Sequence, residues 1–311
     1  DYPVEVKAAE IMLADQKYAE AAKWFAKAPK TQLDETAYYQ YIVAEFYSGN
    51  AKNALEVARH GLQKYAGSEY LSRLAVMAAV DQNQFPEALT YSENVMRGKE
   101  QKNYNDYYYY GQALAGNDKF QEAINAYNKC LELKPGEVDP LSKLSAAYAG
   151  LGDGDKALDF QRQYLEKGTN ITSTDWADFA GIYIKMGDQV DSLDHAKAVG
   201  YYTQAMDVYE KMTEKFPTLK DWCWVAEASV ALGKLKDLDK VRDLYMKVAE
   251  YEEAKADKSD ANTKNYLVAA YYFLGYYYAG KNDAETSKSY FEKLIQIDPE
   301  NAEAKKALGL E

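Results

Sequence analysis

One residue pattern recurs in the same register at three places along this chain of 311 residues. In each copy a small residue is followed four positions later by an aromatic residue and then by a proline. Twelve positions separate the small residue from the proline every time: Ala123 to Pro135, Ala205 to Pro217 and Ser287 to Pro299. A fixed spacing of this kind predicts an array of stacked helical hairpins, because each hairpin can bury its apolar face only against the next one.

Small residues at equivalent positions of the second helices predict eight repeats. They are Ala21, Ala54, Ala88, Ala123, Ala157, Ala205, Val241 and Ser287. Five of the gaps between them lie close to 34 residues, whereas the gaps after Ala157 and Val241 are 48 and 46 residues. The excess predicts insertions near residues 189–199 and 250–262.

The two insertions have different compositions. The first could lengthen the second helix of the sixth repeat or add a loop, and Ser192 and Asp194, which are typical of a helix start, favour the longer helix. The second is rich in Glu, Lys, Asp and Ala, and we expect it to extend a helix and add an exposed loop. We expect both insertions to be solvent-exposed and without a binding role. The alternative is that they form a rim at one end of the array that contacts a specific partner.

Turn-forming residues separate the two helices of a repeat. They are Gly49-Asn50, Gly116-Asn117-Asp118, Gly152-Asp153-Gly154, Gly187-Asp188 and the segment 280–283. Short turns predict antiparallel helices. Pro135, Pro217 and Pro299 mark the exits of second helices, because proline has no N–H to continue a helix. Residues 301–310 are expected to form a final capping helix.

The composition agrees with an all-helical, soluble chain. There are only 7 prolines, and helix-forming residues occur throughout. The formal net charge of −12 argues against binding to nucleic acid, which requires Lys and Arg to neutralise phosphates. Tyrosine is abundant, at 30 residues, and its ring suits half-buried positions on a repeat surface.

The repeated residues resemble the tetratricopeptide repeat, a helix–turn–helix unit of about 34 residues. The first clear copy reads Tyr107-x2-Tyr110-Gly111 and then Ala123-x3-Tyr127, and the last reads Tyr271-x2-Leu274-Gly275 and then Ser287-x3-Phe291. The resemblance implies an all-α, right-handed superhelical solenoid of antiparallel helix pairs. We expect about eight repeats and a C-terminal capping helix, in a single domain that spans residues 1–311.

In the proteins that this chain resembles, the first helices line a concave groove. Carried onto this sequence, the groove positions and their neighbours are Tyr39, Phe46, Tyr47, Arg73, Tyr108, Gln112, Tyr272 and Tyr276. Rigid tyrosines lose little entropy on binding, so an aromatic groove is expected to hold an apolar or basic extended segment. The alternative is that several of these tyrosines only pack between repeats.

A well-known subgroup of the family grips acidic chaperone tails with a clamp of Lys, Asn and Arg. The corresponding positions here hold Val6, Glu10, Tyr39 and Val43. This departure argues against an acidic-tail partner.

No residue pattern predicts catalysis, a cofactor or a metal site. The run Gly150 to Gly154 lacks the third glycine of a dinucleotide fingerprint and is better interpreted as a turn between helices. His60 and His195 have no second ligand at helical spacing, and Cys130 falls at a predicted core position. The segment 266–280 is too short to span a bilayer.

The leading hypothesis is therefore a noncatalytic scaffold that binds a protein or peptide segment. One alternative is glycan handling in a bacterial envelope, using the exposed faces of Trp176, Trp222 and Trp224, of which Trp176 is expected to be buried. Another is a structural module of a larger assembly. Because the chain begins at Asp1 without Met, we expect a periplasmic or surface-anchored bacterial protein, with a cytoplasmic location as the alternative.

Overall fold

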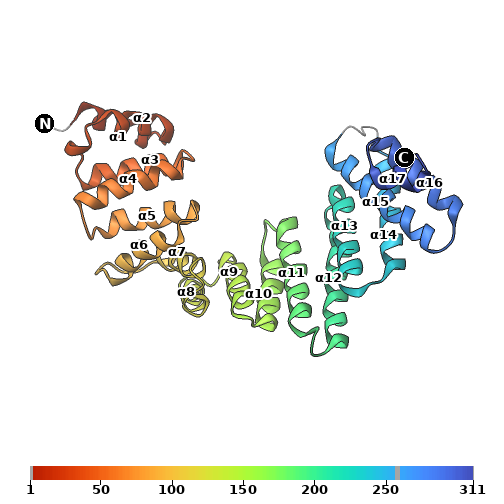
Figure 1. The fold of residues 1–311 in the computed structure, drawn as a ribbon. Helices are drawn as coiled ribbons and strands as arrows, with labels where there is room; N and C mark the ends of the chain where they lie inside the picture. The colour runs from red at the N-terminus through yellow and green to blue at the C-terminus, as the bar shows by residue number, and fades with distance from the viewer. Residues whose placement is uncertain (1–2, 256–259, 311) are drawn as a thin grey trace. The chain divides into compact units, whose positions relative to one another are not determined.

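A computed structural model of the protein describes residues 3–255 and 260–310. Over these residues the chain forms seventeen α-helices and no strand, so the all-α prediction is confirmed. The chain divides into two compact units, Asp1–Lys167 and Gly168–Glu311. Each unit is a succession of antiparallel helix pairs (Figure 1).

The first unit contains five helix pairs. They are α1 (Val4–Ala14) with α2 (Tyr18–Lys27), α3 (Glu35–Tyr47) with α4 (Ala51–Lys64), α5 (Glu69–Asp81) with α6 (Phe85–Arg97), α7 (Tyr104–Ala115) with α8 (Phe120–Leu133), and α9 (Asp139–Leu151) with α10 (Gly154–Lys167). The first helix of each pair also contacts the first helix of the next, from α1 through to α9. In this unit the odd-numbered helices therefore form one face.

The second unit contains three pairs and a last short helix. They are α11 (Ser173–Val190) with α12 (His195–Lys215), α13 (Lys220–Val230) with α14 (Leu238–Glu253), and α15 (Ala261–Gly280) with α16 (Ala284–Ile297), followed by α17 (Ala302–Leu308). The eight pairs and the final helix across the described residues match the predicted repeats and cap. α17 packs on α16 through the buried Ala304, which is how a capping helix covers the last apolar face.

The small residues that marked the repeats lie where the two helices of a pair cross. Seven of the eight are completely buried, and Ser287 is 6% exposed, so the predicted register is correct. At this crossing the Ser287 hydroxyl donates to the carbonyl of Gly275 at 2.9 Å, and the Ser145 hydroxyl donates to the carbonyl of Ala157 at 2.8 Å. Side chains larger than these would hold the paired helices apart.

Most intra-repeat turns contain one residue with a left-handed backbone. These residues are Gln16, Gly49, Asn83, Asp118, Gly152, Lys236 and Asn282, with φ between 54° and 88°. Four of them belong to predicted turns, where Gly, Asn and Asp tolerate this conformation best. The prolines also behave as predicted, because α8, α12 and α16 each end two residues before one.

The predicted turn at Gly187-Asp188 is wrong. α11 continues through both residues to Val190, and the turn comes at residues 191–194. A Cβ on Gly187 would lie 2.4 Å from Cε1 of Tyr202, so glycine is needed here for close helix packing rather than for a turn. The Asp188 carboxylate accepts hydrogen bonds from the Tyr202 hydroxyl at 2.7 Å and from Nζ of Lys234 at 2.6 Å.

Both insertions lengthen helices. Asp194 caps α12 by accepting from the backbone N–H of Lys197 at 3.0 Å, as the sequence predicted, but the insertion near residues 189–199 lengthens α11 as well. Near residues 250–262, α14 continues to Glu253 and α15 begins at Ala261 after its cap, Asp260. The predicted exposed loop falls on residues 256–259, outside the described residues.

Among the described residues, none of the helices has the length and apolar character that crossing a bilayer would require.

Candidate functional site

A cavity of about 370 Å³ opens on the face formed by α3, α5 and α7. These are the first helices of three consecutive repeats, and α6 supplies the floor through Ser92 and Val95. α3 contributes two tyrosines, α5 contributes a tyrosine, an arginine and three apolar residues, and α7 with its cap contributes four residues. They are Tyr39, Tyr47, Tyr70, Arg73, Leu74, Val76, Met77, Asn103, Asn105, Asp106 and Tyr109.

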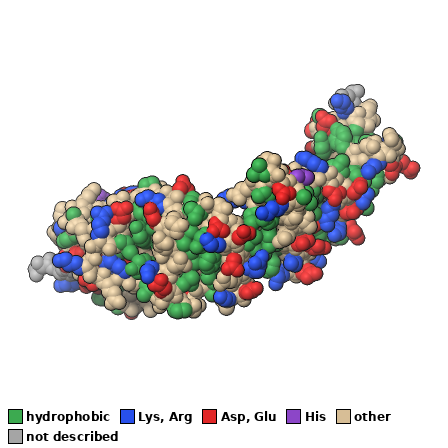
Figure 2. All heavy atoms as spheres, turned by 90° about the horizontal axis from the view of Figure 1, so that it is seen from below, with side chains coloured by type: hydrophobic (Ala, Val, Ile, Leu, Met, Phe, Trp, Pro, Cys, Tyr) green, Lys and Arg blue, Asp and Glu red, His purple; other side chains and the backbone are tan. Residues whose placement is uncertain are grey.

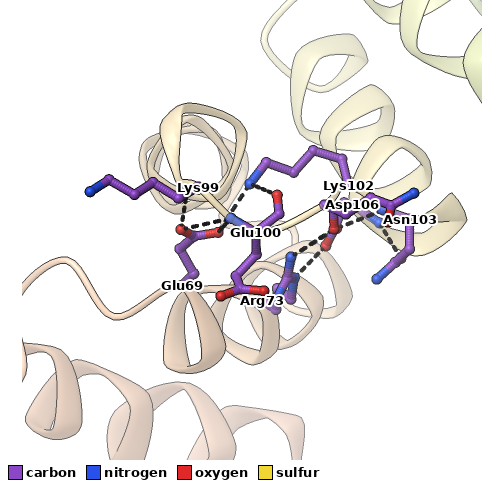
Figure 3. Close-up of polar contacts among 8 residues, drawn as sticks. Glu69, Arg73, Lys99, Glu100, Lys102, Asn103 and Asp106 are labelled. Carbon is purple, nitrogen blue, oxygen red and sulfur yellow. Dashed lines mark hydrogen bonds and ion pairs between the residues drawn. The ribbon is translucent and has the colours of Figure 1, made fainter.

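Arg73 and Asp106 form an ion pair at one wall of this cavity (Figure 3). Nε of Arg73 donates to one carboxylate oxygen of Asp106 at 2.8 Å, and a terminal guanidinium nitrogen donates to the other at 3.2 Å. The Asp106 side chain is 3% exposed, so the pair is largely removed from water. These hydrogen bonds raise the pKa of Arg73, and the guanidinium is neutralised by a partner within the protein.

The same carboxylate begins α7. Asp106 accepts from the backbone N–H of Asn103 at 3.0 Å, and the Asn103 side chain accepts from the backbone N–H of Asp106 at 3.2 Å. This reciprocal capping box satisfies two N–H groups at the start of the helix. One residue thus links the cap of α7 to the middle of α5.

The segment between α6 and α7 is tied down by Glu69 at the start of α5 (Figure 3). The Glu69 carboxylate accepts from the backbone N–H of Lys99 at 2.6 Å and from Nζ of Lys102 at 3.0 Å. The Lys102 ammonium also donates to the Glu100 carbonyl at 2.6 Å. This network holds the segment between α6 and α7 in place beside the cavity.

A second cavity, of about 410 Å³, adjoins the first and shares two of its tyrosines. It is lined by Glu35, Thr36, Tyr39 and Tyr70. Tyr39 and Tyr70 are 40% and 53% exposed, so their rings are available at the surface. Glu35 lies in the first turn of α3, half-buried, and forms no ion pair or hydrogen bond with the described residues.

Three of the predicted groove residues meet at the first cavity. They are Tyr39, Tyr47 and Arg73. Tyr47 is 56% exposed and packs against Tyr18 with ring centroids 5.4 Å apart. Their role in binding stays a prediction, but the cavity brings them together.

Three other predicted residues in this unit do not line that cavity. Phe46 is half-buried and joins the hydrophobic core of the unit, edge-on to Tyr47 at 5.6 Å. Tyr108 is half-buried among aromatic neighbours, stacked on Tyr104 at 5.7 Å and edge-on to Tyr127 at 6.3 Å. Gln112 lies half-buried one turn further along α7. The surroundings of Tyr108 therefore agree with the alternative interpretation, in which a tyrosine at a groove position only packs between repeats.

The last two predicted residues form an exposed pair on α15, in the second unit. Tyr272 and Tyr276 are each 41% exposed, with ring centroids 5.0 Å apart. The Tyr276 hydroxyl donates to Glu303 of α17 at 2.6 Å, and this hydrogen bond, with burial, raises the pKa of Tyr276 to about 12. Tyr276 also packs edge-on against Phe291 at 5.2 Å. Its hydroxyl is already bonded within the protein.

Two tyrosines of the cavity were not predicted from the sequence. Tyr70 lies three residues before Arg73, hence on the same face of α5, and that spacing is the signal that identifies it. Tyr109 follows Tyr108 directly, and it is Tyr109 that lines the cavity. Burial raises the pKa of the Tyr109 hydroxyl above its ordinary value.

The cysteines and tryptophans are used in packing. Cys130 and Cys223 are both buried, as predicted for Cys130, and burial raises the pKa of their thiols to about 12 and about 11. Trp176 is half-buried with the Lys215 ammonium 5.0 Å from its ring. Trp222 is 36% exposed and sits edge-on to Tyr209, whereas Trp224 sits edge-on to Tyr251.

Charged groups are mixed over the surface. Figure 2 shows Lys and Arg side chains interspersed with Asp and Glu on the face drawn, without a continuous basic area. Within residues 3–255 and 260–310 there is no group of three or more His, Cys, Asp or Glu side chains arranged to hold a metal ion.

Comparison with known proteins agrees with the fold of paired helices. The tetratricopeptide repeat profile matches residues 104–137 and 268–301, which are the α7–α8 and α15–α16 pairs. The chain is similar to the C-terminal part of a tetratricopeptide repeat-containing protein from Cytophaga hutchinsonii, with a TM-score of 0.63 and 17% identity over 87% of this chain and 99% of that one. It is also similar to a tetratricopeptide repeat protein from Parabacteroides merdae, with a TM-score of 0.50 and 15% identity over 89% of this chain and 98% of that one.

No curated protein matches the sequence. At these identities the solved structures show a shared fold. The two matched segments are helix pairs, and the pairs between them in the sequence are built in the same way. The chain shares the fold of solved repeat proteins over most of its length. Residues 104–137 and 268–301 are therefore tetratricopeptide repeats, in a chain whose fold is that of solved tetratricopeptide repeat proteins.

Proposed function

We propose that this protein is a noncatalytic scaffold that binds an extended segment of a partner protein on the α3–α5–α7 face. Tetratricopeptide repeat arrays in general are protein-interaction scaffolds, since stacked helix pairs present long, rigid surfaces. The observation that carries the finer proposal is the cavity of about 370 Å³ lined from three consecutive first helices.

The chemistry of this cavity suits a peptide better than a small charged ligand. Its tyrosines combine a large apolar ring with a polar tip and lose few rotamers on binding. The apolar side chains of Leu74, Met77 and Val95 form the interior, and Asn103 and Asn105 place amide groups at one edge. Amides at an edge can pair with the backbone of an extended chain, while the interior buries one of its side chains.

The proposal is tested by selecting random linear peptides displayed on phage against the full chain. We expect enriched peptides to lose at least tenfold in affinity for the double variant Tyr39→Ala/Tyr70→Ala, because truncating aromatic anchors at an interface costs about 2 kcal/mol or more. Both tyrosines are more than a third exposed, so the variant should keep its helical circular dichroism.

The matched control is Tyr272→Ala/Tyr276→Ala, a pair of similar exposure in the second unit. Binding of the enriched peptides to this variant is expected to stay within a factor of two of the unmodified chain. If no peptide is enriched, or if the α15 variant loses binding as strongly as the α3–α5 variant, the α3–α5–α7 face is not the binding surface.

A further inference from the structure

The adjoining cavity joins two tyrosine rings to a carboxylate that has no partner among the described residues. Glu35 lies one helical turn before Tyr39 on α3, and Tyr70 of α5 completes the lining with Thr36. No cation of the described residues pairs with Glu35. Side chains from consecutive repeats thus combine the electron-rich faces of aromatic rings with a negative charge.

This combination attracts a cation. The face of an aromatic ring carries negative potential and attracts ammonium or guanidinium groups, most strongly when the cation is desolvated. A carboxylate adjacent to the ring adds an ion pair and hydrogen-bond acceptors.

The second unit also combines an aromatic ring with a carboxylate, and there the chain itself supplies the cation. There the Arg242 guanidinium lies 5.4 Å from the centre of the Tyr277 ring, and the Tyr277 hydroxyl is hydrogen-bonded to Asp239. Lys281 approaches the same ring at 5.2 Å and Asp239 at 3.4 Å. At Glu35, Tyr39 and Tyr70 the acid and the rings are present, and the part of the chain that the structure describes supplies no such cation.

The charges around the two cavities favour a basic ligand over an acidic one. Arg73 is held by both oxygens of Asp106, and Lys102 is held by Glu69. Near the start of α3, Nζ of Lys64 donates to the carbonyls of Thr31 and Leu33. Arg73 and Lys102 are thus neutralised by carboxylates and Lys64 is hydrogen-bonded to the backbone, whereas Glu35 has no partner among the described residues.

We propose that Glu35, Tyr39 and Tyr70 bind the side chain of a lysine or arginine in a partner protein, while the neighbouring 370 Å³ cavity receives a large apolar side chain of the same segment. This inference rests on the proposed function and names the class of segment that is bound. The two cavities share Tyr39 and Tyr70, so one extended chain can occupy both.

The test compares the peptide pools selected on the unmodified chain with those selected on Glu35→Gln. We expect the first pool to be enriched in Lys or Arg beside a large apolar residue, and the second to keep the apolar residue and lose the basic one. Replacing the lysine of an enriched peptide by norleucine should weaken binding to the unmodified chain about tenfold and leave binding to Glu35→Gln almost unchanged. Binding of the lysine peptide should weaken as salt is raised.

Glu20→Gln is the matched control. Glu20 also lies in the first turn of a helix and is exposed. That helix, α2, is the second helix of its repeat, so this variant removes the same charge from another place on the molecule. Its selected pool should match that of the unmodified chain.

The possible outcomes separate the two proposals. Peptides that require Tyr39 and Tyr70 but show no preference for Lys or Arg, or keep that preference on Glu35→Gln, overturn the cation site and leave the scaffold function standing. A pool enriched in Asp or Glu overturns it as well. If no peptide binds, both proposals fail.

Discussion

At the scale of single residues, one carboxylate accepts three hydrogen bonds, two of which join neighbouring repeats. Glu87 of α6 accepts hydrogen bonds from Nε of Arg59 at 2.8 Å and from the Tyr91 hydroxyl at 2.6 Å, and its other oxygen accepts from a terminal nitrogen of Arg59 at 2.6 Å. The bidentate hydrogen bond from Arg59 lowers the pKa of Glu87. Because Arg59 belongs to α4, this network ties the second repeat to the third.

This lowered pKa makes stability depend on pH in one direction. A carboxylate whose pKa is lower in the folded state contributes stability above its unfolded pKa, and that contribution is lost as pH falls through the folded pKa. Side-chain exposures of 36% for Arg59 and 28% for Glu87 keep the contribution near 1 kcal/mol. We predict that Glu87→Gln lowers the free energy of unfolding by about 1 kcal/mol at pH 7, measured by urea denaturation.

The difference between Glu87→Gln and the unmodified chain should shrink as pH falls below about 4.5, where the unfolded carboxylate is protonated. Glu122→Gln provides the comparison, because Glu122 is exposed and its ion pair with Lys119 is 3.9 Å long. That variant should change stability by less than about 0.5 kcal/mol at any of these pH values. A pH-independent deficit for Glu87→Gln would contradict this assignment.

Individual residues also decide how much of the site could be predicted from the sequence. The run Tyr107 to Tyr110 offers no contrast between apolar and polar residues, so the face of α7 that meets the cavity cannot be identified from it. A shift of one residue turns a helix by about 100°, which is why Tyr109 lines the cavity while Tyr108 packs on Tyr104. The ion pair of Arg73 was equally hidden, because it depends on a residue 33 positions away.

At the scale of helices, the sixth repeat depends on one close approach. Tyr202 of α12 packs directly against the backbone of α11 at Gly187. The equivalent contacts occur between Gly111 and Tyr127, and between Gly275 and Phe291. An aromatic ring packed on glycine is therefore how these pairs hold their two helices together.

We predict opposite effects for two glycine substitutions in the same helix. In Gly187→Ala the new methyl would lie 2.4 Å from Tyr202, and the resulting overpacking should lower the free energy of unfolding by about 1–3 kcal/mol. In Gly181→Ala the methyl meets nothing within 4 Å, and the better helix propensity of alanine should raise it by about 0.5–1 kcal/mol. Thermal and urea denaturation of both variants measure the two values.

If Gly187→Ala proved as stable as Gly181→Ala, the close packing of Tyr202 on α11 would be wrong.

The packing at Gly187 also explains the mistaken turn. Gly followed by Asp is typical of a turn when only local sequence is considered. Tertiary packing decides otherwise here, because the insertion near residues 189–199 gives α11 a partner helix long enough to need Gly187 at the interface. The anchors Ala21 to Ser287 were predictable because small size is required at every crossing, whatever the length of the helices.

At the scale of the whole molecule, contacts connect helices that are close in the sequence. Each helix within a unit packs on the one before and the one after it, and α3, α5 and α7 form the face that carries both cavities. The boundary between the units Asp1–Lys167 and Gly168–Glu311 falls within the 48-residue gap from Ala157 to Ala205, but from the sequence that gap predicted an insertion and not a boundary. The predicted single domain stays a prediction.

Stability in such an array is a sum of repeat and nearest-neighbour terms. We predict that Gly187→Ala increases amide hydrogen exchange most in α11 and α12, less in α13, and least in α16 and α17, as measured by mass spectrometry of the full chain. Gly181→Ala should slow exchange in the same helices. An equal increase in exchange along the whole of α11 to α17 would mean that the second unit opens in one step instead.

The dual role of Asp106 has a consequence for the timing of recognition. Because one carboxylate starts α7 and also holds Arg73, this wall of the cavity is assembled before a partner arrives. A partner should then associate in a single phase, without a slow rearrangement, at the rate of about 10⁵–10⁷ M⁻¹s⁻¹ usual for docking onto rigid surfaces. Competing segments would differ chiefly in how long they stay bound.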